Sequence, residues 1–140
     1  MEEYTINEVA EITGITAYTL RYYESIGVLP TPARTRGSRR YSDQDVQLIS
    51  FIQGLKQTGM KLSEIALFME DGCILSPSGE QQDWTNVLEK RIRILTEHMK
   101  ELDARMQEVA RVKAAAAAKC AYYAERLQAK KQDDGERIIK

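Results

Sequence analysis

The sequence has few cysteines and no long apolar run. Its two cysteines, Cys73 and Cys120, lie far apart in the chain, so neither a disulfide framework nor a locally spaced metal site is predicted, as is typical of a reducing compartment. No apolar stretch reaches the roughly 18 residues that a membrane span needs. The first residues, "MEEYTINEVAEITG", lack the basic start and apolar core of a secretory signal. We therefore expect a cytoplasmic protein that does not enter a membrane.

The sequence also lacks the residue combinations that enzymes use. Catalysis would need a nucleophile with a base, paired carboxylates or a phosphate-binding loop within one compact site, and no such constellation is present. At 140 residues the chain is near the usual size of one domain. We expect a protein that is not an enzyme and that carries no metal and no cofactor.

Proline and glycine are absent between Gln81 and Leu127, whereas both interrupt the chain before Glu70. This contrast predicts short helices in the first part and one long helix in the second. The predicted fold class is mainly α, with an N-terminal winged helix-turn-helix domain followed by a long coiled-coil dimerisation helix. The expected segments are the DNA-binding domain at 1–70, a linker loop at 71–82, the long helix at 83–128 and a frayed tail at 129–140.

Two helices joined by a short turn are predicted at the N-terminus. Thr5 and Glu8 have the spacing of a capping box, and Gly14 can end the first helix in a left-handed conformation. Thr16 then caps a second helix, from about Ala17 to Ile26. Two short helices with a glycine in the turn are typical of a helix-turn-helix.

The second helix carries an arginine beside two tyrosines. Tyr23 shares the apolar side of this helix with Leu20, so Tyr23 is predicted to be buried. Arg21 and Tyr22 then face outward beside small residues, which lets the helix sit low in a groove. Arginine can bind guanine edges or phosphate, and a tyrosine hydroxyl can reach phosphate oxygens. This helix is the predicted DNA-recognition helix.

Four arginines gather in the segment "RTRGSRR", residues 34–40, although the net charge of the chain is -1. The net charge gives no overall attraction to nucleic acid, so the local distribution matters more. Pro30 and Pro32 exclude helix before this segment, and Gly37 permits a tight turn. We predict a hairpin, or wing, whose arginines reach the DNA backbone or the minor groove.

Two more helices are predicted before the linker. The third opens at Ser42, with Asp43 and Asp45 favoured in its first turn by the helix dipole. Gly54 inside this helix should cost on the order of 1 kcal/mol relative to alanine, and the sequence offers no reason for it. The fourth helix is expected at about Leu62 to Met69.

Apolar residues follow heptad spacing along the long helix. From Leu88 to Val109 the steps alternate between four and three residues, which is the seam of a coiled coil; the seam weakens at Lys113. The N-terminal domain is too small to cover this stripe, so it must pair with another copy. The alternative is an intramolecular helical hairpin, which is disfavoured because no glycine or proline between Asp83 and Ala129 could make the turn. Parallel and antiparallel pairing both fit. The predicted dimer interface is Leu88, Ile92, Leu95, Met99, Leu102, Met106 and Val109.

The motifs together resemble the MerR family of transcriptional regulators. The resemblance rests on "YTINEVAEITGITAYTLRYYESIGVL", "RGSRRYS", "GMKLSEI" and the heptad helix, and it covers roughly residues 3–112. It implies homodimers with an antiparallel coiled coil that bind double-stranded DNA at a palindromic promoter operator. It also implies that they untwist an over-long promoter spacer so that RNA polymerase can engage, with an effector of unknown chemistry shifting the dimer between repressing and activating forms.

The resemblance also implies individual DNA contacts on the second helix and on the wing, at Arg39 and Tyr41. Charge alone adds Arg34, Arg36 and Arg40, and Lys56 and Lys61 are weaker phosphate candidates. The complete predicted DNA-binding set is Thr16, Ala17, Tyr18, Thr19, Arg21, Tyr22, Arg34, Arg36, Arg39, Arg40, Tyr41, Lys56 and Lys61.

The chain departs from the family pattern in three places. Lys61 stands where the fourth helix usually has a serine or threonine cap. Gly54 stands at the position where one branch of the family carries a reactive cysteine. The clustered cysteines of metal-sensing members are missing, since Cys73 and Cys120 are widely spaced.

Three alternatives stay open from the sequence. The protein could be an architectural or phage-type winged helix-turn-helix protein that needs no effector, or the coil could serve as a scaffold for another protein. Cys73 and Cys120 could form a thiol sensor across the dimer, although two ordinary half-buried cysteines are the simpler interpretation. A ligand role for His98, the single histidine, is disfavoured because no second histidine accompanies it.

Overall fold

The computed structural model describes residues 3–71 and 84–139, with side chains up to residue 135. Two compact units make up the chain, Met1–His98 and Met99–Lys140. The first unit holds four short helices, a small sheet and the beginning of the long helix α5 (Thr85–Ile139). The second unit is the remainder of α5. The predicted mainly α fold, with a helix-turn-helix and a wing followed by a long helix, is confirmed.

The first two helices begin and end as their caps predict. At the start of α1 (Ile6–Thr13), the Glu8 N–H donates to Thr5 Oγ1 at 3.2 Å and the Thr5 N–H donates to Glu8 Oε1 at 3.0 Å. The bond from the Thr5 backbone holds the pKa of Glu8 below its usual value. Gly14 ends α1 with φ of 76°, a left-handed conformation that glycine adopts without strain. At the start of α2 (Ala17–Ser25), the Thr19 N–H donates to Thr16 Oγ1 at 3.1 Å.

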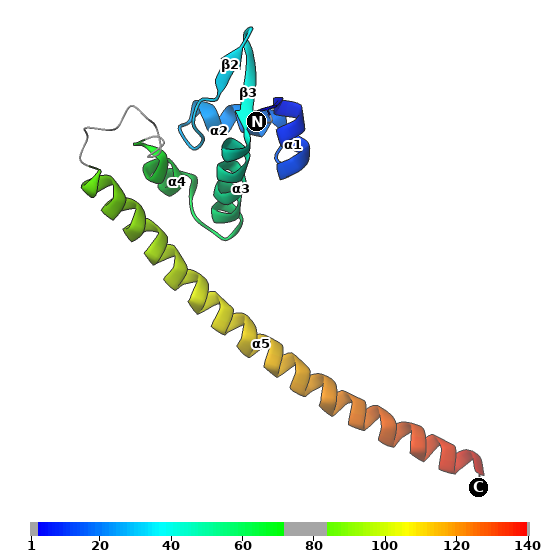
Figure 1. Ribbon diagram of the computed structural model, residues 1–140. Coiled ribbons are helices and arrows are strands. Elements are labelled where there is room, and N and C mark those ends of the chain that lie inside the picture. The colour runs from blue at the N-terminus through cyan, green and yellow to red at the C-terminus, as the bar shows by residue number, and fades with distance from the viewer. Residues whose placement is uncertain (1–2, 72–83, 140) are drawn as a thin grey trace. The chain divides into compact units, whose positions relative to one another are not determined.

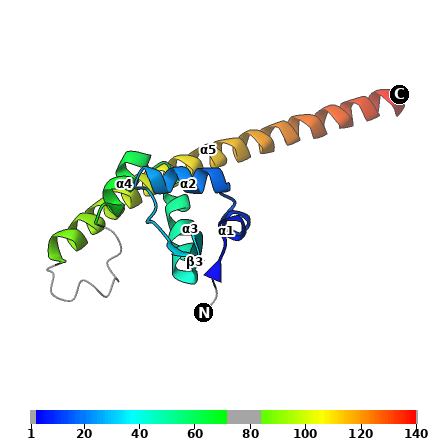
Figure 2. The ribbon, with the colours of Figure 1, turned by 90° about the horizontal axis from the view of Figure 1, so that it is seen from above.

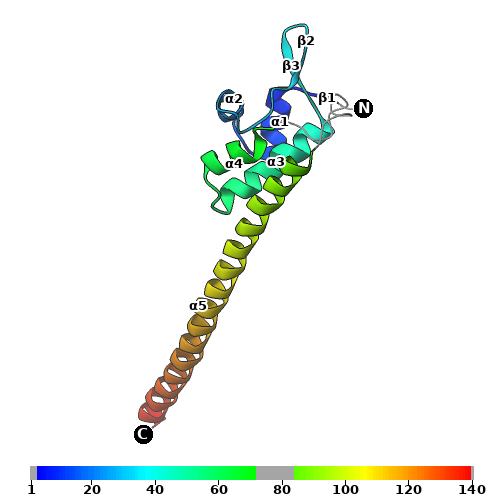
Figure 3. The same ribbon diagram turned by 90° about the vertical axis from the view of Figure 1, so that its left-hand side faces the viewer.

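The wing is a two-stranded hairpin that gains a third, short strand. β2 (Ala33–Thr35) and β1 (Glu3–Tyr4) both pair antiparallel with β3 (Ser38–Ser42), in the order β1-β3-β2. Thr35 lies opposite Ser38, which leaves Arg36 and Gly37 as a two-residue turn. Their φ values of 54° and 81° are those of a type I′ hairpin turn. In Figures 1 and 3 the β2–β3 hairpin extends past α1 and α3.

The next two helices differ in how they begin. Ser42 forms a capping box with Asp45 at the start of α3 (Asp43–Gln57), as its sequence predicts. α4 (Leu62–Met69) starts after Lys61, which makes no side-chain cap hydrogen bond. The uncapped start of α4 is expected, because Lys61 stands where a serine or threonine would cap the helix. Figure 2 shows α1 and α3 beside β3, in agreement with the contacts of both helices with that strand.

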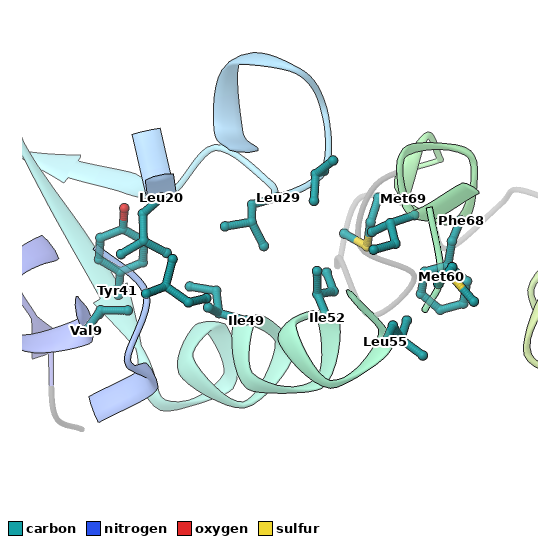
Figure 4. Packing of buried hydrophobic residues seen from close by; sticks show 13 residues of the cluster. Val9, Leu20, Leu29, Tyr41, Ile49, Ile52, Leu55, Met60, Phe68 and Met69 are labelled. Atoms are coloured by element: carbon teal, nitrogen blue, oxygen red, sulfur yellow. The ribbon is translucent and has the colours of Figure 1, made fainter. Parts of the chain in front are cut away.

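The core of the first unit is built on one side of α3. Figure 4 shows Leu20 and Tyr41 near Ile49, with Phe68 and Met69 of α4 toward the other end of α3. Full burial of each such side chain contributes about 1.5–3 kcal/mol. The cluster consists of Val9, Ile15, Leu20, Val28, Leu29, Tyr41, Ile49, Ile52, Leu55, Met60, Ile65, Phe68 and Met69.

The beginning of α5 belongs to the first unit because its side chains pack there. Lys90 Nζ lies 3.0 Å from Glu70 Oε1 and 2.5 Å from Asp71 Oδ2, and the bond to Asp71 raises the pKa of Lys90. Ile94 and Leu95 pack against the core. The compact unit therefore reaches His98, beyond the boundary at residue 70 that we expected.

The rest of α5 is helical through Ile139, including most of the segment 129–140 that we expected to fray. Met99, Met106 and Val109 of the predicted seam are each more than half exposed within the single chain. None of the described helices combines the length and apolarity needed to cross a bilayer.

Candidate nucleic-acid interface

The recognition helix divides its side chains between the core and the outside. Leu20 is buried, and Tyr23 is partly buried against the core, because the two lie on one side of a helix with 3.6 residues per turn. Tyr18 is 80% exposed and Tyr22 49% exposed, and Arg21 is exposed as well. α2 thus presents one cation and two aromatic hydroxyls outside the core.

The remaining predicted contacts of α2 lie at its first turn. Thr16 is exposed, whereas Ala17 and Thr19 are half-buried. Thr16 Oγ1 and Thr19 Oγ1 lie 2.9 Å apart and share a hydrogen bond. Both threonines therefore shape the start of the helix in addition to lining its surface.

The arginines of the wing have different environments. Arg34 and Arg36 are exposed and Arg40 is half-buried. Arg34 Nη1 donates to the Gly37 carbonyl at 3.3 Å, which braces the hairpin turn. Arg36 has a positive φ of 54°, a conformation that costs free energy for any residue with a β-carbon.

Arg39 and Tyr41 point into the unit. Arg39 Nε donates to Glu24 Oε2 at 2.8 Å, and this bond raises the pKa of Arg39. Tyr41 is only 4% exposed, and burial raises its pKa. The structure therefore gives Tyr41 a place in the core and pairs Arg39 with an acid that the sequence analysis did not single out. Glu24 and Arg39 lie far apart in the chain, so no local spacing signals the pair.

Arg21 and Arg40 are brought together at one cleft. This cleft has a volume of about 320 Å³, and it is lined by Thr5, Ile6, Arg21, Gly37, Ser38, Arg39 and Arg40. The start of α1, the recognition helix and the wing all contribute to it. A hollow lined by arginines and by two hydroxyl residues, Thr5 and Ser38, suits an anion such as a phosphodiester.

The other predicted residues lie outside this cleft. Lys56 in the last turn of α3 and Lys61 before α4 are both exposed.

Cys120 is an exposed free cysteine, and Cys73 lies outside the described residues. In the parts of the chain that are described, no three histidine, cysteine, aspartate or glutamate side chains are grouped to hold a metal ion.

A helix-turn-helix followed by an arginine-bearing hairpin defines a winged helix-turn-helix protein. The family model "MerR HTH family regulatory protein" matches residues 4–71. The HTH-type transcriptional regulator YyaN of Bacillus subtilis (strain 168) is 42% identical over 113 residues, which is 78% of this chain and 82% of YyaN. The chain belongs to the MerR family of helix-turn-helix transcriptional regulators.

Solved structures agree with this assignment. HiNmlR, a MerR family regulator lacking the sensor domain and crystallised with promoter DNA, is 32% identical, with a TM-score of 0.71 over 89% of this chain and 92% of that one. A MerR family protein from Listeria monocytogenes has the same fold, with a TM-score of 0.77 over 97% of each chain at 22% identity. The predicted family and fold are confirmed, and the relatives are regulators rather than enzymes.

Proposed function

We propose that this protein regulates transcription as a homodimer that binds a palindromic promoter operator, with α2 in the major groove and the wing beside it. The observation that carries the proposal is the exposed Arg21 on α2 at the same cleft as Arg40 of the wing. HiNmlR, which the chain resembles over most of its length, was crystallised on promoter DNA. The two cationic elements of this chain suit the same kind of partner.

The proposed contacts follow the exposure of the side chains. Arg21 binds a base edge or a phosphate, and the hydroxyls of Tyr18 and Tyr22 bind phosphates. Arg36 occupies a turn position that asparagine or glycine would fill with less strain, which supports a role for its guanidinium in the minor groove. Tyr41 is left out of the proposed contacts because it is buried.

Further contacts are proposed around these residues. Thr16, Ala17 and Thr19 lie at the first turn of α2, where the polar groups of a recognition helix meet the groove. Arg34 and Arg40 add phosphate contacts from the wing, and Lys56 and Lys61 are the weakest candidates, since both lie outside the cleft.

The proposed dimer uses the apolar stripe of α5. Met99, Met106 and Val109 are exposed in the single chain, and a stripe of this kind is stable in water only when another surface covers it. Pairing of two identical copies gives twofold symmetry, which a palindromic operator requires. The antiparallel orientation is proposed from the resemblance to the MerR family. Leu95 packs on its own core, so it contributes less to the pairing than the other seam residues.

The proposed mechanism is distortion of the promoter spacer, through which the dimer acts on RNA polymerase indirectly. An effector of unknown chemistry would shift the dimer between its repressing and activating forms. HiNmlR is a MerR family regulator that lacks the sensor domain, which supports regulation without an effector but not the architectural or phage-type alternative. Transcription with purified polymerase separates the three: activation by the protein alone supports regulation without an effector, activation that needs an added compound supports an effector, and no change in transcription supports the architectural alternative.

Replacing one exposed arginine tests the DNA-binding proposal. Arg21→Ala should weaken binding to the promoter DNA flanking the gene by roughly tenfold to a hundredfold, as for loss of a specific arginine contact. Fluorescence anisotropy gives the affinity, and sedimentation should show an unchanged mass.

The matched control is Arg111→Ala, which removes the same charge from an exposed position of α5 away from the heptad seam. It should bind like the wild type. If Arg21→Ala binds as tightly as the control, α2 is not the recognition helix.

A further inference from the structure

One ion pair joins the recognition helix to the wing. Arg39 of β3 and Glu24 of α2 meet at 2.8 Å, and their side chains are only 22% and 12% exposed. Most exposed ion pairs contribute little because water screens them and long side chains must be ordered. This pair is largely removed from water, so its geometry is fixed more firmly than that of a surface pair.

Both partners are attached to rigid elements. Glu24 lies in the last turn of α2, one turn after the buried Leu20. Arg39 lies two residues before the buried Tyr41, and alternate residues of a strand share one face. The face of β3 that carries these two residues is therefore the face held against the helical core, with Tyr41 as an apolar anchor and Arg39 as a charged one.

The other described residues of the hairpin form no ion pair with the helices, although Arg40 is half-buried and interacts electrostatically with Glu8 of α1. All three residues of β2 are exposed, as are Arg36 and Gly37 in the turn. Tyr41 sits near the base of the hairpin, and Arg39 is nearer to its tip. The pair with Glu24 is thus the described ion pair that joins the hairpin to α2 nearest to its tip.

We infer that Arg39 is a positioning residue that acts through Glu24 to hold the wing arginines in register with Arg21 of the recognition helix. The inference rests on the proposed function and assigns Glu24, an acid at a DNA-facing surface, a necessary part in it. Arg39 lines the cleft together with Arg21 and Arg40, so its bond to Glu24 holds one wall of the cleft in place. One phosphodiester can then meet both elements without reordering the wing on binding.

A direct DNA contact by Arg39 would make DNA affinity respond in the opposite direction when Glu24 is neutralised. If Arg39 were a direct phosphate contact, then neutralising Glu24 would release its guanidinium and remove a repulsive charge, so DNA binding would tighten. If Arg39 positions the wing through Glu24, neutralising Glu24 lets the wing move and DNA binding weakens. The direction of the change therefore distinguishes the two roles.

The experiment measures promoter binding of the full chain by fluorescence anisotropy between about 50 and 200 mM salt. Glu24→Gln should bind about tenfold more weakly than the wild type, and the double variant Glu24→Gln/Arg39→Gln should be no weaker than Arg39→Gln alone, as expected for partners in one pair. The plot of log affinity against log salt should become shallower by about 0.9 for each phosphate contact that the wing loses. Glu108→Gln, an exposed acid of α5, is the matched control and should bind normally.

The exchanged pair Glu24→Arg/Arg39→Glu tests whether the loss of DNA binding comes from the broken ion pair or from misfolding. It should recover part of the affinity that Glu24→Gln loses, because it restores opposite charges at the same two sites. Glu24→Gln binding as tightly as the wild type, or more tightly with a steeper salt dependence, would overturn the inference. Failure of the wild type to prefer promoter DNA over shuffled DNA would instead overturn the proposed function.

Discussion

Gly54 lies within α3, where glycine is expected to be unfavourable. A β-carbon built at this position would meet no described atom within 4 Å, and its backbone is in ordinary helical conformation rather than at positive φ. Its carbonyl accepts a hydrogen bond from Thr58 Oγ1 at 2.7 Å, which any residue could do. Neither space nor backbone geometry in the single chain requires glycine here.

Gly54→Ala should therefore stabilise the protein by about 0.5–1 kcal/mol, since alanine loses less backbone entropy on entering a helix. Urea unfolding followed by circular dichroism measures the change. Gly14→Ala is the contrasting control, because φ is 76° at that position and alanine should destabilise it. A loss of stability in Gly54→Ala would mean that a surface absent from the single chain covers this position.

For single residues, the sequence predicts burial or exposure where these depend on the position of the residue within its own helix. Helical periodicity separates Tyr23 from Arg21 and Tyr22, and the structure agrees. The same reasoning does not reveal that Tyr41 is buried or that Arg39 is paired. Those environments depend on how β3 packs on α2, which local spacing along the chain does not encode.

At the scale of elements, a buried polar contact joins the end of α3 to α5. His98 is 5% exposed, and its Nε2 lies 2.8 Å from Thr58 Oγ1. The two atoms share a hydrogen bond whose direction depends on the tautomer of the imidazole. The sequence disfavours a ligand role for His98, and in the structure its side chain packs in the first unit.

Thr58→Val should destabilise the protein by about 1–3 kcal/mol, because it leaves Nε2 of a buried imidazole without this hydrogen-bond partner. The double variant with His98→Ala should cost less than the sum of the two single changes, with a coupling of about 0.5–3 kcal/mol. Thr35→Val, at an exposed position of β2, is the control and should change stability by less than about 0.5 kcal/mol. Strict additivity of the two changes would contradict the hydrogen bond.

Helix boundaries were predictable where a cap or a glycine marks them. The range of α4, Leu62–Met69, matches its prediction, and the capping boxes at Thr5 and Ser42 are present. The strand β1 was not predicted, since it has two residues and exists through pairing with β3, far along the chain. Short elements that depend on distant partners leave no periodic signal.

At the scale of the whole molecule, the account depends on pairing of two chains through α5. Met106 is 68% exposed in the single chain, and the heptad seam places it where a second helix would cover it. A seam of this length could be recognised from sequence because its period is regular over many residues. The period does not determine how the partner helix is oriented, since parallel and antiparallel seams have the same period.

Met106→Asp should convert the protein into monomers, because a charge in the seam must be desolvated on pairing. Sedimentation should then give a mass near the 16.0 kDa of one chain, and operator binding should weaken because a half-site contact is lost. Gln107→Asp adds the same charge at the neighbouring exposed position and should remain dimeric. A Met106→Asp variant that keeps the wild-type mass would exclude the seam as the interface.

Two copies of this chain are proposed to bind one DNA duplex together through α2 and the wing. Selection of binding sites from a random pool of double-stranded DNA by the full chain tests this joint binding. An inverted repeat should be enriched, with half-sites that lie one helical turn or a whole number of turns apart. Enrichment of a lone half-site, or of no sequence at all, would contradict it.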